Sequence, residues 1–257
     1  MDLPAPTKPL KINRFLPYWA VLQMDVRQTL RSWSFRLWIA AAVVLSIGYL
    51  LHRAAIHHQA GIQQSAATLM SEVLQFTILI GTTLVIMLTA GTISSERGTM
   101  ADSVLSRGIS RYSYFMGKWH ARLFTYVGSF LFIAILALIA SITLLHGDLS
   151  LIGSLLAMAL VAAVLVMVIS CGVTVSSFCN STVLGIAVLW MALYGVGVAL
   201  ALLEYGMLNP VKLLKLLPVM LHGEYDLHMQ ATLIGYCFAV SGGAALLGLI
   251  HFARRDV

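Results

Sequence analysis

Six long apolar stretches, separated by polar segments, dominate the hydrophobic pattern of this chain. They cover residues 35–51, 73–95, 123–145, 151–176, 183–203 and 231–252. Each is close to the roughly 20 residues that cross a bilayer as an α-helix. None alternates as a strand does, and hydrocarbon offers no water to pair with an open backbone. The pattern predicts an all-α integral membrane protein with six transmembrane helices in one domain, residues 35–252.

The segment that precedes these stretches, residues 1–34, has an amphipathic pattern. Large apolar side chains recur at intervals of three or four residues: Trp19, Leu22, Val26, Leu30 and Trp33. Asp25 and the arginines fall on other positions, and Pro17 suits the start of a helix. A helix with this pattern lies well in the headgroup region of a membrane. We predict a cytoplasmic N-terminus followed by an interfacial elbow helix.

Composition and charge agree with this prediction and set an orientation. The chain is 60% hydrophobic and only 10% charged, whereas soluble domains carry about a quarter charged residues. Thirteen of the sixteen cations fall on the side that the termini share: Lys8, Lys11, Arg14, Arg27, Arg31, Arg36, Arg97, Arg107, Arg111, Lys118, Arg122, Arg254 and Arg255. By the positive-inside rule both termini, including the tail 253–257, are cytoplasmic. The basic charge therefore reports topology, and we predict no nucleic-acid partner.

Motifs for catalysis are missing from the sequence. There is no Gly-x-x-x-x-Gly-Lys-Ser/Thr phosphate loop and no His-Glu-x-x-His zinc motif. The middle of each apolar stretch is also free of acidic residues, which argues against proton or sodium coupling. We expect no catalytic residue, no enzyme activity and no cofactor in this chain.

Hydroxyl side chains within the apolar stretches allow two interpretations. They are Thr82, Thr83, Thr89, Thr92, Ser170 and Thr174. Small residues permit close packing between membrane helices. The alternative is that they line a translocation path between two copies or two related subunits.

The predicted outer face carries six of the eight histidines: His52, His57, His58, His146, His222 and His228. Imidazole could bind copper or another soft metal, but no ligand spacing recurs, so we predict no metal site. The outer segment 204–230 begins a short helix at Asn209-Pro210, since Asn caps and Pro fits the first turn. We expect Pro218 to interrupt it.

The polar segment between the second and third stretches, residues 96–122, carries five cations against only Glu96 and Asp102. Its order of residues is Glu96-Arg-Gly-Thr99, Val104-Leu-Ser106, Ile109-Ser-Arg111 and Gly117-Lys118. This order resembles the loop signature of ABC type-2 exporter permeases, approximately Glu-x-Gly-Thr, Leu-Leu-Ser-x-Pro-Ile-Ser-Arg and Gly-Lys. The chain departs from it at Gly108, where the family often has proline. The six stretches, elbow helix and long outer segment extend the resemblance over most of the chain.

The resemblance implies a partner, a separate cytoplasmic ATPase subunit in two copies, which would bind the ATP and magnesium. It also implies a second permease copy or paralogue and a place in a bacterial cytoplasmic (inner) membrane. A coupling helix at about 99–105, after a break at Gly98, would dock on the ATPase, with a smaller contact from 177–182. The residues implied are Glu96, Arg97, Gly98, Thr99, Met100, Val104, Leu105, Ser106, Arg107, Ser110, Arg111, Gly117 and Lys118.

Within this segment, Met100, Val104 and Leu105 offer an apolar face to a partner helix groove. Arg107, Arg111 and Lys118 could pair with acidic side chains of the partner or with lipid phosphates. The sequence therefore predicts the transmembrane subunit of an ATP-driven exporter. Two alternatives stay open: a membrane scaffold that recruits a cytoplasmic protein without transport, and a copper-linked maturation permease.

Overall fold

Helices make up all the secondary structure that can be described. The computed structural model describes residues 15–60, 65–96, 109–145, 147–202 and 209–254, with the side chains of residues 57, 58 and 60 excepted. No strand occurs within these ranges. The prediction of an all-α fold is confirmed for this part of the chain.

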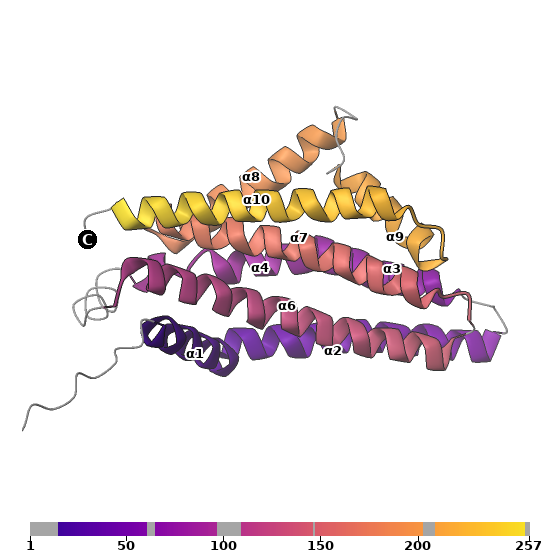
Figure 1. The fold of residues 1–257 in the computed structure, drawn as a ribbon. Helices are drawn as coiled ribbons and strands as arrows, with labels where there is room; N and C mark the ends of the chain where they lie inside the picture. Colours follow the sequence, from indigo (N-terminus) through magenta and orange to yellow (C-terminus); the bar gives the residue numbers. More distant parts are fainter. Residues whose placement is uncertain (1–14, 61–64, 97–108, 146, 203–208, 255–257) are drawn as a thin grey trace, which may run out of the picture.

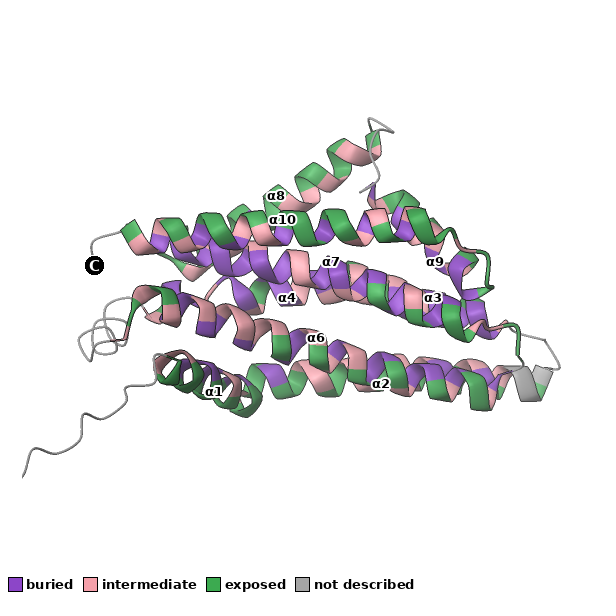
Figure 2. Cartoon of the chain, in the orientation of Figure 1, coloured by how far each residue is buried: buried purple, intermediate pink, exposed green. Residues whose placement is uncertain are grey.

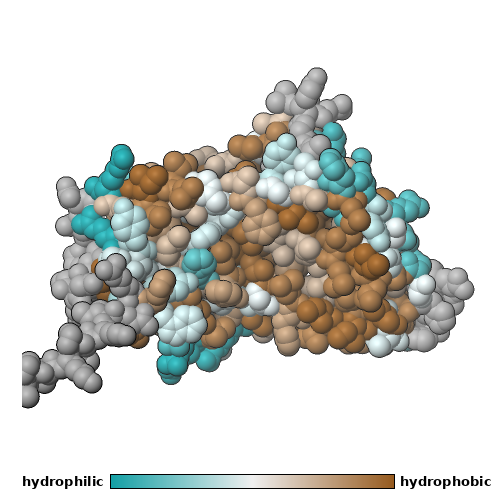
Figure 3. Space-filling view, in the orientation of Figure 1, coloured by the Kyte–Doolittle hydropathy of each residue, from teal (hydrophilic) through white to brown (hydrophobic). Residues whose placement is uncertain are grey.

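Six stretches are long and apolar enough to cross a membrane: Trp33–Ile56, Ala66–Glu96, Arg111–Leu144, Leu151–Phe178, Thr182–Leu202 and Leu227–Arg254. Each overlaps one of the six predicted stretches. Figure 3 shows apolar side chains over most of the visible face and hydrophilic ones toward its two ends. The chain is thus a multi-pass membrane protein.

The elements that make these stretches are as follows: α1 (Leu16–Arg31), α2 (Trp33–Ala60), α3 (Ala66–Phe76), the π-helix η1 (Thr77–Gly81), α4 (Thr82–Thr89), the 3₁₀ turn η2 (Ser94–Glu96), α6 (Arg111–Leu144), α7 (Leu151–Phe178), α8 (Thr182–Leu202), α9 (Pro210–Leu221) and α10 (Leu227–Arg254). Figure 1 shows α1 and the last turn of α10 at one end of the bundle, here named the terminal end. The end that holds α9 is named the distal end.

The third stretch begins much earlier than predicted. Helix α6 starts at Arg111, where Ser110 Oγ accepts a hydrogen bond from the Ser113 amide at 3.1 Å. Residues 111–122, which we predicted as loop, therefore form the first three turns of α6. Hydropathy missed these turns because they are helical but polar, and a serine N-cap can begin a helix outside the apolar region.

Helix α7 forms the centre of the bundle. It is apolar on all sides, as expected of a helix without a solvated face, and it packs against α4, α6, α8, α9 and α10. Figure 2 shows its buried surface between more exposed neighbours. Helix α8 instead leans away from the bundle in Figure 1, and only Gly185 and Leu189 on it are buried.

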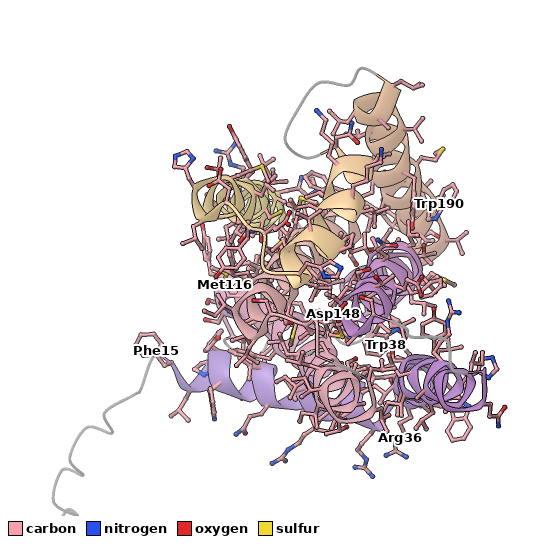
Figure 4. All side chains as sticks on the ribbon, turned by 90° about the vertical axis from the view of Figure 1, so that its right-hand side faces the viewer. Phe15, Arg36, Trp38, Met116, Asp148 and Trp190 are labelled. Atoms are coloured by element: carbon pink, nitrogen blue, oxygen red, sulfur yellow. The ribbon has the colours of Figure 1, made fainter. Side chains whose placement is uncertain are left out.

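Helix α1 lies across the other helices. Figures 1 and 4 show it roughly perpendicular to the bundle axis. Its buried residues are Val21, Leu22, Asp25 and Thr29, whereas Trp19, Leu30 and Trp33 remain exposed. Most of the predicted apolar stripe thus stays outside the protein core. Asp25, which falls outside the predicted apolar stripe, is nevertheless buried and faces α6.

Of two predicted helix breaks, the one at Pro218 differs from the structure and the one at Gly98 stays a prediction. In the second span the α-helix ends at Thr89, before Gly98, which lies outside the described residues. Helix α9 begins at Asn209 as predicted, with Asn209 Oδ1 accepting from the Val211 amide at 2.9 Å. It does not stop at Pro218. Proline cannot donate to the Leu214 carbonyl, and Gln75 Nε2 of α3 donates to that oxygen instead, at 3.0 Å.

The distal end is closed by contacts between the start of α7 and the end of α9. The Ser150 amide donates to the Leu221 carbonyl at 2.8 Å, and Ser150 Oγ caps α7. Gly153 lies directly against the Met220 carbonyl, where a Cβ atom would overlap the oxygen. Only glycine allows the backbones to approach this closely.

Replacing Gly153 by alanine is therefore expected to destabilise the protein by about 1–3 kcal/mol, the usual range for overpacking. Thermal unfolding in detergent would measure this. The matched control is Gly128→Ala on α6, where no atom lies within 4 Å of the new Cβ. An equal unfolding temperature for both variants would contradict the close approach.

Asp148 joins three elements at the distal end. Its Oδ1 accepts from the Ala67 amide at 3.2 Å, and its Oδ2 lies 3.8 Å from His222 Nδ1. Partial burial disfavours the carboxylate, but hydrogen bonds from Ser65 and Ala67, together with His222, lower the Asp148 pKa below its usual value.

A carboxyl group with a lowered pKa stabilises the fold above its unfolded pKa, and this contribution is lost as pH falls through the folded value. We expect wild type to unfold at a higher temperature than Asp148→Asn at neutral pH, and the difference to shrink below about pH 4. Unfolding curves of both proteins across this range test it. A difference that grows on acidification would show that the charge is unimportant.

Candidate functional site

Four charged side chains gather at the terminal end of the bundle. They are Asp25 of α1, Glu96 of η2, and Lys118 and Arg122 of α6; with Tyr114 of α6 they form what we name the terminal-end network. It ties the elbow-like helix α1 to both sides of the polar segment between the second and third spans.

Lys118 is the centre of the network. Its Nζ donates to Asp25 Oδ1 at 3.1 Å and to Glu96 Oε1 at 2.7 Å. Tyr114 Oη donates to the other Glu96 oxygen at 2.6 Å. One ammonium group thus bridges two carboxylates that lie far apart in the sequence.

Arg122 completes the charge balance. Its Nε lies 3.2 Å from Asp25 Oδ2, and its Nη1 donates to Thr29 Oγ1 at 2.9 Å. Two cations then face two anions. The side chains of Lys118 and Asp25 are only 4% and 3% exposed, so the charges depend on one another rather than on water.

Local sequence places these groups. Tyr114, Lys118 and Arg122 are four residues apart and share one face of α6. Gly117 sits beside them, and a Cβ atom there would lie 2.8 Å from Val21 Cγ1 and 3.2 Å from the Tyr18 carbonyl oxygen. The Gly-Lys pair therefore has a structural reason: the glycine lets α1 approach, and the lysine binds the acid that α1 carries.

Glu96 is held in position by the centre of the bundle. After α4 ends, the amides of Ile93 and Ser94 both donate to Ser176 Oγ of α7, at 2.8 and 3.0 Å. This fixes the turn that leads into η2. A small cavity of about 110 Å³ lies next to it, between α1 and α6, lined in part by Met24, Ile109 and Lys118.

Five of the predicted coupling residues belong to the described part of the chain. Glu96, Gly117 and Lys118 meet at the network, Ser110 caps α6, and Arg111 Nη1 donates to the Ala253 carbonyl of α10 at 3.2 Å. The prediction that Lys118 pairs with a partner's acids or with lipid phosphates is wrong, because Asp25 and Glu96 of its own chain occupy it. The remaining residues fall outside the described ranges: Arg97, Gly98, Thr99, Met100, Val104, Leu105, Ser106 and Arg107.

The hydroxyl residues proposed as a path lining serve helix packing. Ser170 Oγ contacts Ser241 of α10 at 2.6 Å, and Thr174 Oγ1 donates to the Ala244 carbonyl at 2.7 Å. Five of the six are buried in this single chain, namely Thr82, Thr89, Thr92, Ser170 and Thr174. Their burial within a single chain favours the packing interpretation for these five, and the path lining stays a prediction. Thr83, which is half-buried, contacts Tyr194 of α8.

The histidines of the distal end form no metal site within the described part of the chain. There, no three His, Cys, Asp or Glu side chains gather closely enough to hold an ion. The side chains of His57, His58 and His146 lie outside the description.

Sequence reasoning missed three members of the network: Asp25, Tyr114 and Arg122. One signal was available. Asp25 is the only acid in residues 16–31, and a lone acid among arginines can indicate a specific partner. The four-residue spacing of Lys118 and Arg122 would have provided that partner only if residues 111–122 had been recognised as helix.

Comparison with models of known protein families and with curated proteins finds no match to this chain.

Replacing Lys118 by methionine should cost about 3–5 kcal/mol of folding stability, because it leaves two buried carboxylates facing one cation. Unfolding in detergent measures the loss. The double variant Glu96→Gln with Lys118→Met removes one charge of each sign and should recover a large part of it. Lys215→Met, an exposed lysine of α9, is the control. A Lys118 variant as stable as this control would show that the network does not stabilise the fold.

Proposed function

We propose that this chain is the membrane-spanning subunit of an ATP-driven exporter, coupled through residues 96–111 to a separate cytoplasmic ATPase. The proposal orients the terminal end toward the cytoplasm, as the distribution of cations predicts. In this arrangement α1 lies at the membrane surface, which its exposed Trp19 and Leu30 favour, together with Trp33 at the start of α2.

The observation that supports coupling most strongly is the anchoring of both ends of this segment. At the start of the segment, Glu96 belongs to the terminal-end network. At its end, Ser110 caps α6, and Arg111 donates to the Ala253 carbonyl near the end of α10. A loop that served only to orient the helices would need no buried ion pairs, which are costly to desolvate. A segment that receives force from a partner needs firm attachment at both ends.

The attachment also indicates how a displacement would spread. A push on this segment reaches α1 through Lys118 and Asp25, and reaches α10 through Arg111 and through Tyr114, whose ring stacks on Phe252 at 5.8 Å. Three helices would then move together. Such rigid-body motion of packed elements is the ordinary way in which small local changes become large ones.

The partners follow from the same proposal. The ATPase subunits bind ATP and magnesium, and this chain carries neither. A second copy or a paralogue completes the membrane part, and the exposed apolar faces of the bundle contact lipid. The membrane would be a bacterial inner membrane, as the family resemblance implies.

The direct test is co-purification with a cognate cytoplasmic ATPase subunit. Val104→Asp with Leu105→Asp should lower ATPase capture by at least about tenfold, since apolar anchors dominate interface energies. Lys215→Glu at the distal end is the matched control. Undiminished capture by the Val104 and Leu105 variant would contradict docking through this segment.

Stimulation of ATP hydrolysis separates an exporter from a scaffold. An exporter subunit should change the ATPase rate when it binds, and Glu96→Gln should weaken this effect while leaving capture intact. A scaffold would capture the ATPase with no change in rate. That outcome would overturn the exporter proposal and leave the docking segment in place.

A further inference from the structure

An apolar groove runs along the side of the bundle between α2 and the second and third spans. Its volume is about 300 Å³. Its lining comes from α2, from the α3–η1–α4 stretch and from α6, and it includes Trp38, Leu45, Tyr49, Phe76, Ile80 and Tyr126. All of these positions lie within the membrane-spanning stretches.

The groove exists because α2 packs mainly on α6 and α1 and leaves a gap beside α3 and α4. Small side chains of α2, Ala41, Ala42 and Ser46, face this gap. On the opposite wall the chain forms the π-helix η1, which ends at Gly81. π-turns widen a helix locally and are frequent at functional positions.

The groove opens sideways onto the surface of the bundle. Leu45, Phe76 and Ile80 line it and are themselves about half or more exposed, at 65%, 51% and 50%. A void of this size is not left empty, because its walls would lose their packing contacts. Water does not fill an apolar void. Inside a membrane, the available apolar material is the acyl chain of a lipid.

The length of the groove suits such a chain. Its lining extends along α2 from Trp38 to Tyr49, which corresponds to about 16 Å at the rise of an α-helix. That is close to half of the roughly 30 Å hydrocarbon core, or the depth of one leaflet. Figure 4 labels Trp38, which marks the end nearer α1.

A cation and an anion lie next to each other at the distal mouth of the groove. Arg53 follows Tyr49 by one turn of α2, and its Nε donates to Tyr49 Oη at 3.1 Å. Tyr49 Oη in turn donates to Glu72 Oε2 of α3. The Arg53 guanidinium lies 3.8 Å from the same carboxylate, and both side chains keep about a third of their surface exposed, at 36% and 33%. Tyr49 thus connects the apolar groove to an accessible cation and anion.

We propose that this groove binds a membrane phospholipid with a zwitterionic primary-amine headgroup, of the phosphatidylethanolamine type. One acyl chain lies between α2 and η1, the phosphate binds Arg53, and the ammonium group binds Glu72. Arginine presents a planar set of donors that matches phosphate. A primary ammonium offers three donors to a carboxylate. A purely anionic lipid would instead place negative charge beside Glu72.

The test uses the purified full-length chain, stripped of lipid in detergent and supplied with one lipid at a time. Native mass spectrometry would compare binding of phosphatidylethanolamine, phosphatidylcholine and phosphatidylglycerol. We expect the first to bind about tenfold more tightly than the others, since one charge-assisted hydrogen bond accounts for such a factor. Equal retention of all three lipids would reduce the groove to nonspecific lipid contact and overturn the proposal.

Variants separate the two headgroup contacts. Arg53→Gln should weaken the binding of all three phospholipids. Glu72→Gln should abolish the preference for phosphatidylethanolamine over phosphatidylglycerol. Arg36→Gln, an exposed arginine at the other end of the same helix, is the matched control and should bind as wild type does. If Arg53→Gln binds phosphatidylethanolamine as well as this control does, the site is elsewhere.

The groove itself is tested without any variant that could fail to fold. A phosphatidylethanolamine with a photoreactive group at the end of one acyl chain should label residues near Trp38 and Tyr126 in the wild-type chain. Labelling of α8 or α10 instead would overturn the assignment. This experiment needs no ATPase, so its failure leaves the proposed function untouched, and the reverse also holds.

Discussion

The balance of charge inside the terminal-end network constrains this end of the molecule. Lys118 and Asp25 have almost no contact with water, and a charge in such surroundings is tolerated only beside an opposite charge and with its hydrogen bonds made. Asp25 requires α1 to lie across α6. Glu96 requires the second span to end in a turn that points back toward Lys118. The elbow helix, the end of the second span and the start of the third are therefore placed by one electrostatic condition.

Several uncharged polar groups elsewhere in the bundle are also paired across helices. Pro218 leaves the Leu214 carbonyl without its helical donor, and Gln75 of another helix supplies one. Ser170 accepts from Trp119 Nε1 at 2.9 Å and contacts Ser241, so three helices share one small polar cluster. At these positions the polar groups fix contacts between helices, because hydrocarbon provides no alternative partner.

The network and the lipid groove share helix α6. Arg122 Nη1 lies 3.5 Å from Tyr126 Oη, and the ring of Tyr126 lines the groove next to Trp38, with the ring centroids 5.9 Å apart. The charged contacts of one end thus continue directly into the apolar wall along the side of the bundle. Under the proposed function, motion of α6 during an ATPase cycle would reshape the groove, and a bound lipid would resist or favour that motion.

Two residues of the loop signature have a structural role within this chain. Gly117 and Lys118, taken from the sequence as a signature, act in the structure on α1 rather than on a partner protein. The part of the signature from Arg97 to Arg107 lies outside the described residues and stays a prediction. The proposed coupling therefore depends on a segment whose two ends have a known environment.

Sequence alone determined the fold class and the number of spans, because long apolar stretches have only one stable form in hydrocarbon. It also located the N-cap of α9 at Asn209, because a cap depends only on one side chain and the next few residues. It could not locate the start of α6, since hydropathy measures contact with lipid and not helicity. Nor could it pair Asp25 with Lys118, which stand 93 residues apart. Contacts of that kind, and the groove that α2 leaves open, arise only when whole helices pack, because they depend on how several backbones approach one another in space.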